Sequence, residues 1–140
     1  MFDGEGARQA GGRWNRRGVA VVYASATLSL ATLEYFVHLD PSDMPDDLVA
    51  VPADIPDPLP RTEIRTESLP ANWRAYPAPE ALAELGTAWV RARRTPILLV
   101  PSAIVPQERN VLLNPAHPEF RRIRVGPPEP FSFDPRLWQR

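Results

Sequence analysis

Glu34 is the acidic residue whose surroundings most suggest a chemical role. On a helical projection its neighbours are largely apolar and include Leu30, Leu33 and Phe36. A carboxylate on so apolar a helix is expected to be partly buried, and burying it without a partner is costly. Glu34 is therefore expected either to have a hydrogen-bonding or charged partner or to serve a chemical role. A salt bridge to a core-facing arginine, a contact with His38 four residues on, or simple surface exposure would explain it without any catalytic role.

Three further side chains could bind an anionic or planar ligand. Arg13 follows a Gly–Gly pair, and glycine allows close backbone approach while a guanidinium forks onto phosphate; an ion pair with Glu34 is the structural alternative. Tyr23 ends an expected buried strand, so its ring could be a stacking surface or part of the core. Ser102 follows another such strand and could supply a pocket hydroxyl. Because no base adjoins it and no GxSxG elbow is present, a serine nucleophile is not expected.

Composition excludes several kinds of chemistry. The chain has no cysteine and no lysine, which excludes thiolate nucleophiles, disulfides, Schiff bases and a P-loop lysine. Its two histidines, His38 and His117, cannot build a multi-histidine zinc site, so no metal is expected. The net charge of −1 gives no bulk attraction to nucleic acid or acidic membranes. With no long apolar run and no signal-peptide pattern, a bacterial-type cytoplasmic location is expected.

The elements that must position these side chains are short and separated by proline. Proline accounts for 18 of 140 residues, well above the usual ~5%, which disfavours long helices. Apolar and β-branched runs predict strands at residues 19–24, 48–51 and 97–100. Two shorter strand candidates lie near the carboxyl end, at residues 123–125 and 131–133. The acidic, proline-rich stretch 54–70 is expected to be an extended loop.

Two helices are expected, over residues 28–39 and 79–94. Ser25 or Thr27 could cap the first. The buried face of the second is expected to hold Leu82, Leu85, Trp89 and Val90. Because strands and helices do not alternate regularly, the pattern predicts an α+β fold with a mixed sheet and flanking helices rather than a doubly wound sheet.

Several unusual blocks occur in a distinctive order: GEGA at 4–7, GGRWN at 11–15, VVYAS at 21–25, LEYFVHL at 33–39, VPSAIVPQERNVLLNP at 100–115, HPEF at 117–120 and FDPRLW at 133–138. In these blocks the chain resembles the RES-domain family, toxins of bacterial type II toxin–antitoxin pairs. The family is named for an arginine, a glutamate and a serine, which correspond by motif to Arg13, Glu34 and Ser102. The resemblance implies one RES domain over residues 1–140 with a fold like that of the diphtheria-toxin-type ADP-ribosyltransferases. Family members usually begin with a further strand, which this chain is expected to lack.

The resemblance also implies an enzyme that uses NAD as its substrate, with no prosthetic group. Such toxins deplete NAD by cleaving its nicotinamide–ribose bond. The alternatives are ADP-ribosylation of a protein target and a truncated, inactive relative that only binds its antitoxin. In this chemistry Glu34 would stabilise an oxocarbenium-like ribose, Arg13 would clamp the pyrophosphate and Tyr23 would stack on nicotinamide. Ser102 would hydrogen-bond the ligand or position Glu34, and Asn114 is a lesser candidate for lining the pocket.

The implied partner is an antitoxin with a helix-turn-helix DNA-binding domain, whose tail blocks the active site. The toxin itself is expected to bind neither nucleic acid nor membrane, and a homodimer could form within the complex. Arg13, Arg16 and Arg17 give the first 22 residues a local positive charge. An acidic or carboxylate-ended antitoxin tail is therefore expected to insert beside these arginines.

Overall fold

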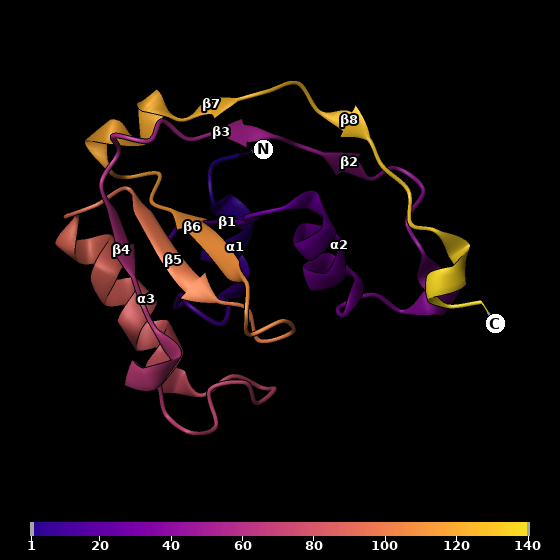
Figure 1. Ribbon diagram of the computed structural model, residues 1–140, viewed down its shortest axis with the longest axis horizontal. Helices are drawn as coiled ribbons and strands as arrows, with labels where there is room; N and C mark the ends of the chain where they lie inside the picture. Colours follow the sequence, from indigo (N-terminus) through magenta and orange to yellow (C-terminus); the bar gives the residue numbers. More distant parts are fainter. Residues whose placement is uncertain (1, 140) are drawn as a thin grey trace.

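A four-stranded mixed sheet forms the centre of the computed structural model, which describes residues 2–139 (Figure 1). Its strands lie in the order β1 (Val22–Ser25), β6 (Arg109–Leu113), β5 (Ile97–Pro101) and β4 (Arg61–Glu63). β6 pairs antiparallel with both β1 and β5, whereas β4 pairs parallel with β5. The predicted α+β class with a mixed sheet is confirmed.

Three α-helices accompany the sheet in the described residues: α1 (Glu5–Ala10), α2 (Leu28–Phe36) and α3 (Glu80–Ala92). α2 begins where Thr27 Oγ1 accepts a hydrogen bond from Leu30 N at 3.1 Å, so Thr27 is the residue that caps it. Short 3₁₀ turns occupy Pro41–Asp43, Thr66–Ser68, Pro118–Arg122 and Pro135–Leu137. Within the described part of the chain, no helix has both the length and the apolar character needed to cross a membrane.

The core has two parts because side chains alternate between the faces of β5 and β6. On one face Leu98, Val100 and Leu112 pack with Trp14 and with residues of α3. On the other face, Ile97, Val111 and Leu113 pack with a second apolar set, Val22, Leu59 and Ile123. The sheet is thus the layer that both parts of the core share, which makes its central strands a rigid base for side chains at their ends.

Gly86 lets the segment 11–15 lie directly against α3. A Cβ at this position would lie 1.7 Å from the backbone oxygen of Trp14, so no larger residue fits without moving the backbone. Trp14 is only 2% exposed and belongs to the core under α3. The packing of α3 therefore fixes the backbone that carries Arg13.

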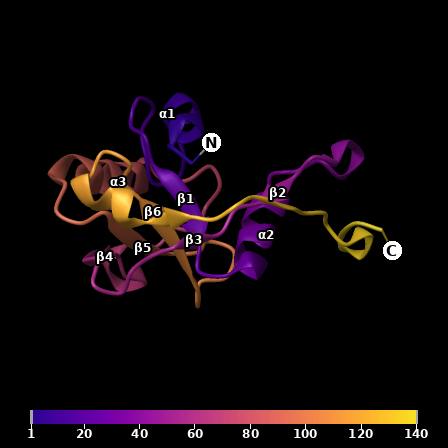
Figure 2. The same cartoon turned by 90° about the horizontal axis from the view of Figure 1, so that it is seen from above.

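A long, thin arm leaves the sheet and passes beyond α2 (Figures 1 and 2). It consists of two short antiparallel pairs, which are β2 (Val49–Ala50) with β8 (Glu129–Pro130) and β3 (Ala53–Asp54) with β7 (Arg124–Val125). The arm meets α2 where the rings of Phe36 and the buried Phe133 lie 5.5 Å apart between centroids.

Tertiary contacts change several of the expectations from sequence. Residues 54–70, expected to be loop, contain β4, because pairing with β5 satisfies backbone groups that so short a polar segment cannot satisfy alone. The helix expected over 28–39 ends at Phe36. Leu85, expected to be buried, is 41% exposed, and the small residues Gly86 and Thr87 face the core instead.

Two further differences lie near the chain ends. α1 was not predicted, because its six residues bury no side chain and so show no apolar periodicity. Residues 131–133, expected to form a strand, form none. The strand of this segment is β8, which immediately precedes them and pairs with β2.

Candidate functional site

Glu34 is half-buried, and one of its carboxylate oxygens is held by two donors from the sheet. Oε2 accepts a hydrogen bond from Ser102 Oγ at 2.7 Å and another from Asn110 Nδ2 at 2.6 Å. Ser102 directly follows β5, and Asn110 lies in β6 opposite Val100. The partial burial expected for Glu34 is confirmed, but its partners are neither an arginine nor His38. Hydrogen bonds of this kind, to a charged acceptor, are the strong ones.

Ser102 is fully buried and its hydroxyl has a single available direction. Ser102 Oγ accepts hydrogen bonds from the backbone N–H groups of Ile104 at 3.1 Å and Val105 at 3.0 Å. With both lone pairs engaged, the hydroxyl hydrogen points at Glu34. Ser102 therefore holds the Glu34 carboxylate in place, and its roles toward a ligand stay predictions.

Asn110 completes this arrangement and was missed by the sequence analysis. Its Oδ1 accepts a hydrogen bond from Ser25 Oγ at 2.8 Å, which orients the amide so that Nδ2 faces Glu34. Among the residues that the structure describes, none hydrogen-bonds to the second oxygen, Glu34 Oε1. One oxygen is thus fixed and the other remains available to a ligand. The signal that could have found Asn110 is its pairing with Ser25 across β1 and β6, which only the register reveals.

Arg13 lies partly buried near Glu34 without forming a close ion pair with it in the described residues. One guanidinium nitrogen donates to the backbone oxygen of Trp73 at 2.7 Å. Burial lowers the pKa of Arg13, and the nearby charges of Glu34, Tyr23 and Tyr76 act in the opposite direction. A guanidinium has five N–H donors and stays charged, so Arg13 retains donors for an anionic ligand.

Tyr23 uses its hydroxyl for structure and leaves its ring open. The hydroxyl accepts from Trp14 N at 3.0 Å and donates to Asn15 Oδ1 at 2.7 Å. Burial of the hydroxyl raises the pKa of Tyr23, so the group stays protonated and is unsuited to general-base work. The side chain as a whole is nevertheless 41% exposed. This combination of a fixed hydroxyl and an accessible ring suits stacking on a planar ligand.

The structure brings Arg13, Tyr23, Glu34 and Ser102 to one region but excludes Asn114. Asn114 is fully buried, its Nδ2 donates to Val90 O at 3.1 Å and its Oδ1 accepts from Ala116 N at 3.0 Å. It follows β6 at the end opposite Asn110, against the start of β5. The expectation that Asn114 lines the pocket is therefore wrong, because both polar atoms of its amide are hydrogen-bonded within the protein, one to α3 and the other to the turn after β6.

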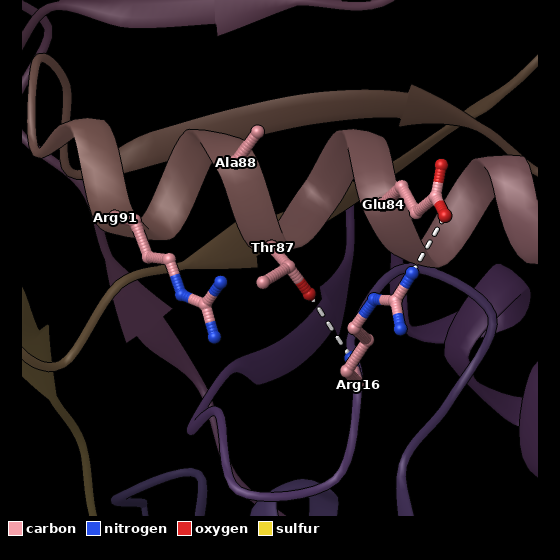
Figure 3. Close-up of a pocket in the computed structure, with 5 residues that line it drawn as sticks. All are labelled: Arg16, Glu84, Thr87, Ala88 and Arg91. Atoms are coloured by element: carbon pink, nitrogen blue, oxygen red, sulfur yellow. Dashed lines mark hydrogen bonds and ion pairs between the residues drawn. The ribbon is translucent and has the colours of Figure 1, made fainter.

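Arg16 also departs from expectation. It was expected to share one basic side of the pocket with Arg13, yet its guanidinium binds Glu84 on α3 at 2.6 Å and its backbone N donates to Thr87 Oγ1 at 3.1 Å (Figure 3). Figure 3 shows Arg16 and Arg91 on the same side of α3, with Thr87 between them. The positive charge of the segment 13–17 is therefore divided between two surfaces.

Two surface hollows lie outside the Glu34 cluster. One, of about 500 Å³, is lined by Arg16, Glu84, Thr87, Ala88 and Arg91. The other, of about 670 Å³, is lined by Ala26, Thr27, Ser29, Glu63, Gln107, Glu108 and Arg109. Neither contains any of the four clustered residues, so the assignment of the site rests on hydrogen bonding and charge. Within the described residues, no group of three or more His, Asp or Glu side chains could hold a metal ion.

Comparison with known proteins connects this geometry with a family. Residues 1–134 match the RES domain. The chain is 43% identical to a Prs ADP-ribosylating toxin of Sphingobium sp. (strain YBL2) over 138 residues, which is 97% of this chain and 86% of that protein. It is 39% identical over 137 residues to a protein named Toxin Res of Yersinia enterocolitica, covering 97% of this chain and 90% of the relative. These matches show that the chain belongs to the RES-domain family, in which both of these relatives are named toxins.

Proposed function

We propose that this protein is a toxin that cleaves the bond between nicotinamide and ribose in NAD. The observation that supports the proposal is the hydrogen bonding of the Glu34 carboxylate. Its Oε2 is fixed by Ser102 and Asn110, and its Oε1 has no partner in the described residues, beside the cationic Arg13. A carboxylate fixed in this way can stabilise positive charge that develops on a bound ligand, without having to reorganise during the reaction.

The proposed reaction breaks the bond between C1′ of the ribose and the ring nitrogen of nicotinamide. The bonding electron pair leaves with nicotinamide, and C1′ acquires oxocarbenium character, which the Glu34 carboxylate stabilises. An acceptor then bonds to C1′ and, where the acceptor is water, one proton is released and ADP-ribose is formed. Arg13 would bind the pyrophosphate through its remaining donors, and the ring of Tyr23 would stack on nicotinamide.

A second candidate is transfer of ADP-ribose to a protein. The relative from Sphingobium that shares 43% of its residues with this chain is named an ADP-ribosylating toxin, which favours this candidate. Both reactions begin with loss of nicotinamide and require the same carboxylate. They differ only in the acceptor at C1′, so one experiment can separate them.

The experiment follows nicotinamide release from NAD by the purified protein, together with the fate of the ADP-ribose. We expect Glu34→Gln to lower turnover about 100-fold or more, since it removes the charge that the transition state requires, with a smaller change in NAD affinity. Glu67→Gln, at an exposed carboxylate in a 3₁₀ turn, is the matched control. Free ADP-ribose would identify hydrolysis, and label retained on a protein would identify transfer. Full turnover by Glu34→Gln would contradict the proposal.

Arg13→Ala separates binding from chemistry at the same site. Because Arg13 is assigned to the pyrophosphate, its loss should weaken NAD binding as well as turnover, about tenfold or more in Kd. Isothermal calorimetry with NAD measures this directly. An Arg13→Ala variant with unchanged affinity would remove the pyrophosphate assignment while leaving the role of Glu34 in place.

We further propose a diphtheria-toxin-type ADP-ribosyltransferase fold, action in the cytoplasm and a cognate antitoxin that blocks the site. Because Arg16 is bound to Glu84, an antitoxin tail reaching the site would meet Arg13 rather than a continuous basic strip. A tail carrying acidic groups would then compete with NAD for the same guanidinium. Titration of NAD in the presence of saturating antitoxin tests this, and unchanged NAD affinity would refute it.

A further inference from the structure

Tyr76 is an aromatic residue with no role in the core. It is 80% exposed, the highest fraction among the exposed large apolar side chains of the described residues. Its ring faces that of His38, with 6.2 Å between the centroids and 52° between the planes. Tyr76 belongs to the loop that leads into α3, and His38 follows the end of α2 (Figure 1). The two rings therefore come together from segments that are distant in sequence.

The loop that carries Tyr76 is fastened to the site at two points. The backbone oxygen of Trp73 accepts the hydrogen bond from Arg13, at 2.7 Å. The next residue, Arg74, donates through Nε to Ala103 O at 2.8 Å, directly beside Ser102. Trp73 itself is only 8% exposed and packs in the core. The backbone just before Tyr76 is thus held in place by these hydrogen bonds, while the Tyr76 side chain itself is exposed to solvent.

Tyr76 also lies near Arg13, since it follows three residues after Trp73, whose backbone oxygen accepts the hydrogen bond from the Arg13 guanidinium. Tyr23 and Tyr76 both contribute to the electrostatics of the Arg13 guanidinium. One cation is therefore accompanied by two accessible aromatic rings, of which Tyr23 has its hydroxyl buried and Tyr76 stands in solvent. A dinucleotide has the matching composition, since two heteroaromatic rings are joined through a pyrophosphate.

We propose that Tyr76, supported by His38, is the stacking surface for the adenine ring of the substrate. The inference rests on the proposed function and extends it to a residue outside the family's arginine, glutamate and serine. Nicotinamide must lie near Glu34, where the bond breaks, and Tyr23 has its hydroxyl held in the buried turn that adjoins Arg13. The solvent-exposed ring of Tyr76 is left for the end of the substrate that does not react. Aromatic stacking is tolerant in geometry because every base has a π face.

The experiment compares wild type, Tyr76→Ala and Tyr76→Phe in NAD cleavage and in competitive inhibition by two probes. ADP-ribose contains adenine, whereas nicotinamide mononucleotide contains the reacting end without it. We expect Tyr76→Ala to raise KM for NAD and the inhibition constant of ADP-ribose about tenfold, with kcat changed less than about twofold. The inhibition constant of nicotinamide mononucleotide should stay the same. Tyr76→Phe keeps the ring and should restore most of the lost affinity, and thermal unfolding of each variant reports its folding.

The possible outcomes separate this inference from the proposed function. Equal weakening of both probes in Tyr76→Ala would place the ring at the reacting end and overturn the adenine assignment. Unchanged affinity for NAD and ADP-ribose, or a fall in kcat alone, would also overturn it while leaving NAD cleavage intact. A wild-type protein that neither binds nor cleaves NAD would overturn the proposed function, and the inference with it.

Discussion

The two longer helices differ sharply in how they are held. α3 has 13 residues, five of them buried, and packs along one face of the sheet. α2 has nine residues, and Leu30 is the one that the structure buries completely among them. Yet α2 carries Glu34. The fold is therefore stabilised mainly by apolar burial at α3, whereas the candidate site depends on a helix that burial holds only weakly.

What fixes α2 instead is a small number of polar and aromatic contacts. Glu34 is joined to Ser102 and Asn110, Thr27 caps the first turn, and Phe36 meets the arm at Phe133. Figure 2 shows α2 at the side of the molecule where the arm extends away from the sheet. Stability and chemistry are thus supported by different interactions, and substitutions should separate them.

The largest expected effect is a difference between matched leucines of the two helices. Leu82 of α3 is fully buried, and Leu33 of α2 is 36% exposed. Leu82→Ala should lower the free energy of unfolding by about 3 kcal/mol through lost burial and a cavity, whereas Leu33→Ala should cost less than about 1 kcal/mol. Urea unfolding measures both. Equal losses would show that α2 is packed as firmly as α3.

The next effect concerns turnover rather than stability. Ser102→Ala and Asn110→Ala each remove one donor to the Glu34 carboxylate, a contact worth about 2 kcal/mol. Each variant should therefore lower kcat about 10- to 100-fold, with a smaller change in KM. Ser68→Ala, which removes an exposed hydroxyl bonded to Arg65 O, is the matched control. If both variants kept wild-type kcat, the fixed orientation of Glu34 would be irrelevant to the reaction.

A smaller effect should be confined to α2. Thr27→Ala removes the cap, which typically costs about 1 kcal/mol. Hydrogen exchange should therefore accelerate about fivefold at the amides of α2 and remain unchanged at those of α3. Thr32→Ala provides the control, since the Thr32 hydroxyl only donates to Leu28 O within the helix. Uniform acceleration throughout the protein would indicate that α2 does not open on its own.

The smallest effect is a dependence on alkaline pH. Burial raises the pKa of Tyr23, so the folded protein retains a proton that the unfolded chain releases near pH 10. This contribution to stability is complete below about pH 10 and is lost as the pH rises towards the folded value. After allowance for solvent screening of the exposed ring, the loss at pH 10.5 should be under about 1 kcal/mol. Unfolding at pH 8 and 10.5 should show a weaker pH dependence in Tyr23→Phe than in wild type; an equal dependence would mean that this hydroxyl is accessible.

Much of the site could be predicted from sequence because its parts lie in distinctive local patterns. The polar GGRWN segment, the acidic residue within an apolar helix and the serine after a buried strand indicated Arg13, Glu34 and Ser102. Asn110 could not be found in this way, because its role arises from pairing with Ser25 and from its distance to Glu34. Asn114 failed for the converse reason: a strand-end amide has the same local appearance whether it faces a ligand or caps the core.

The sequence by itself determined the α+β class, the positions of the two longer helices and of strands β1 and β5, and the absence of thiol and lysine chemistry, whereas the strand between them, β6, was not predicted. These follow from periodicity, proline placement and composition, which are local properties of the chain. Only the tertiary structure decided that Arg16 turns to Glu84, that Tyr76 meets His38 and that one oxygen of Glu34 is held while the other is left open. Each of these depends on groups brought together from distant segments, because hydrogen bonds and ring contacts are set by distance and direction in space rather than by spacing along the chain.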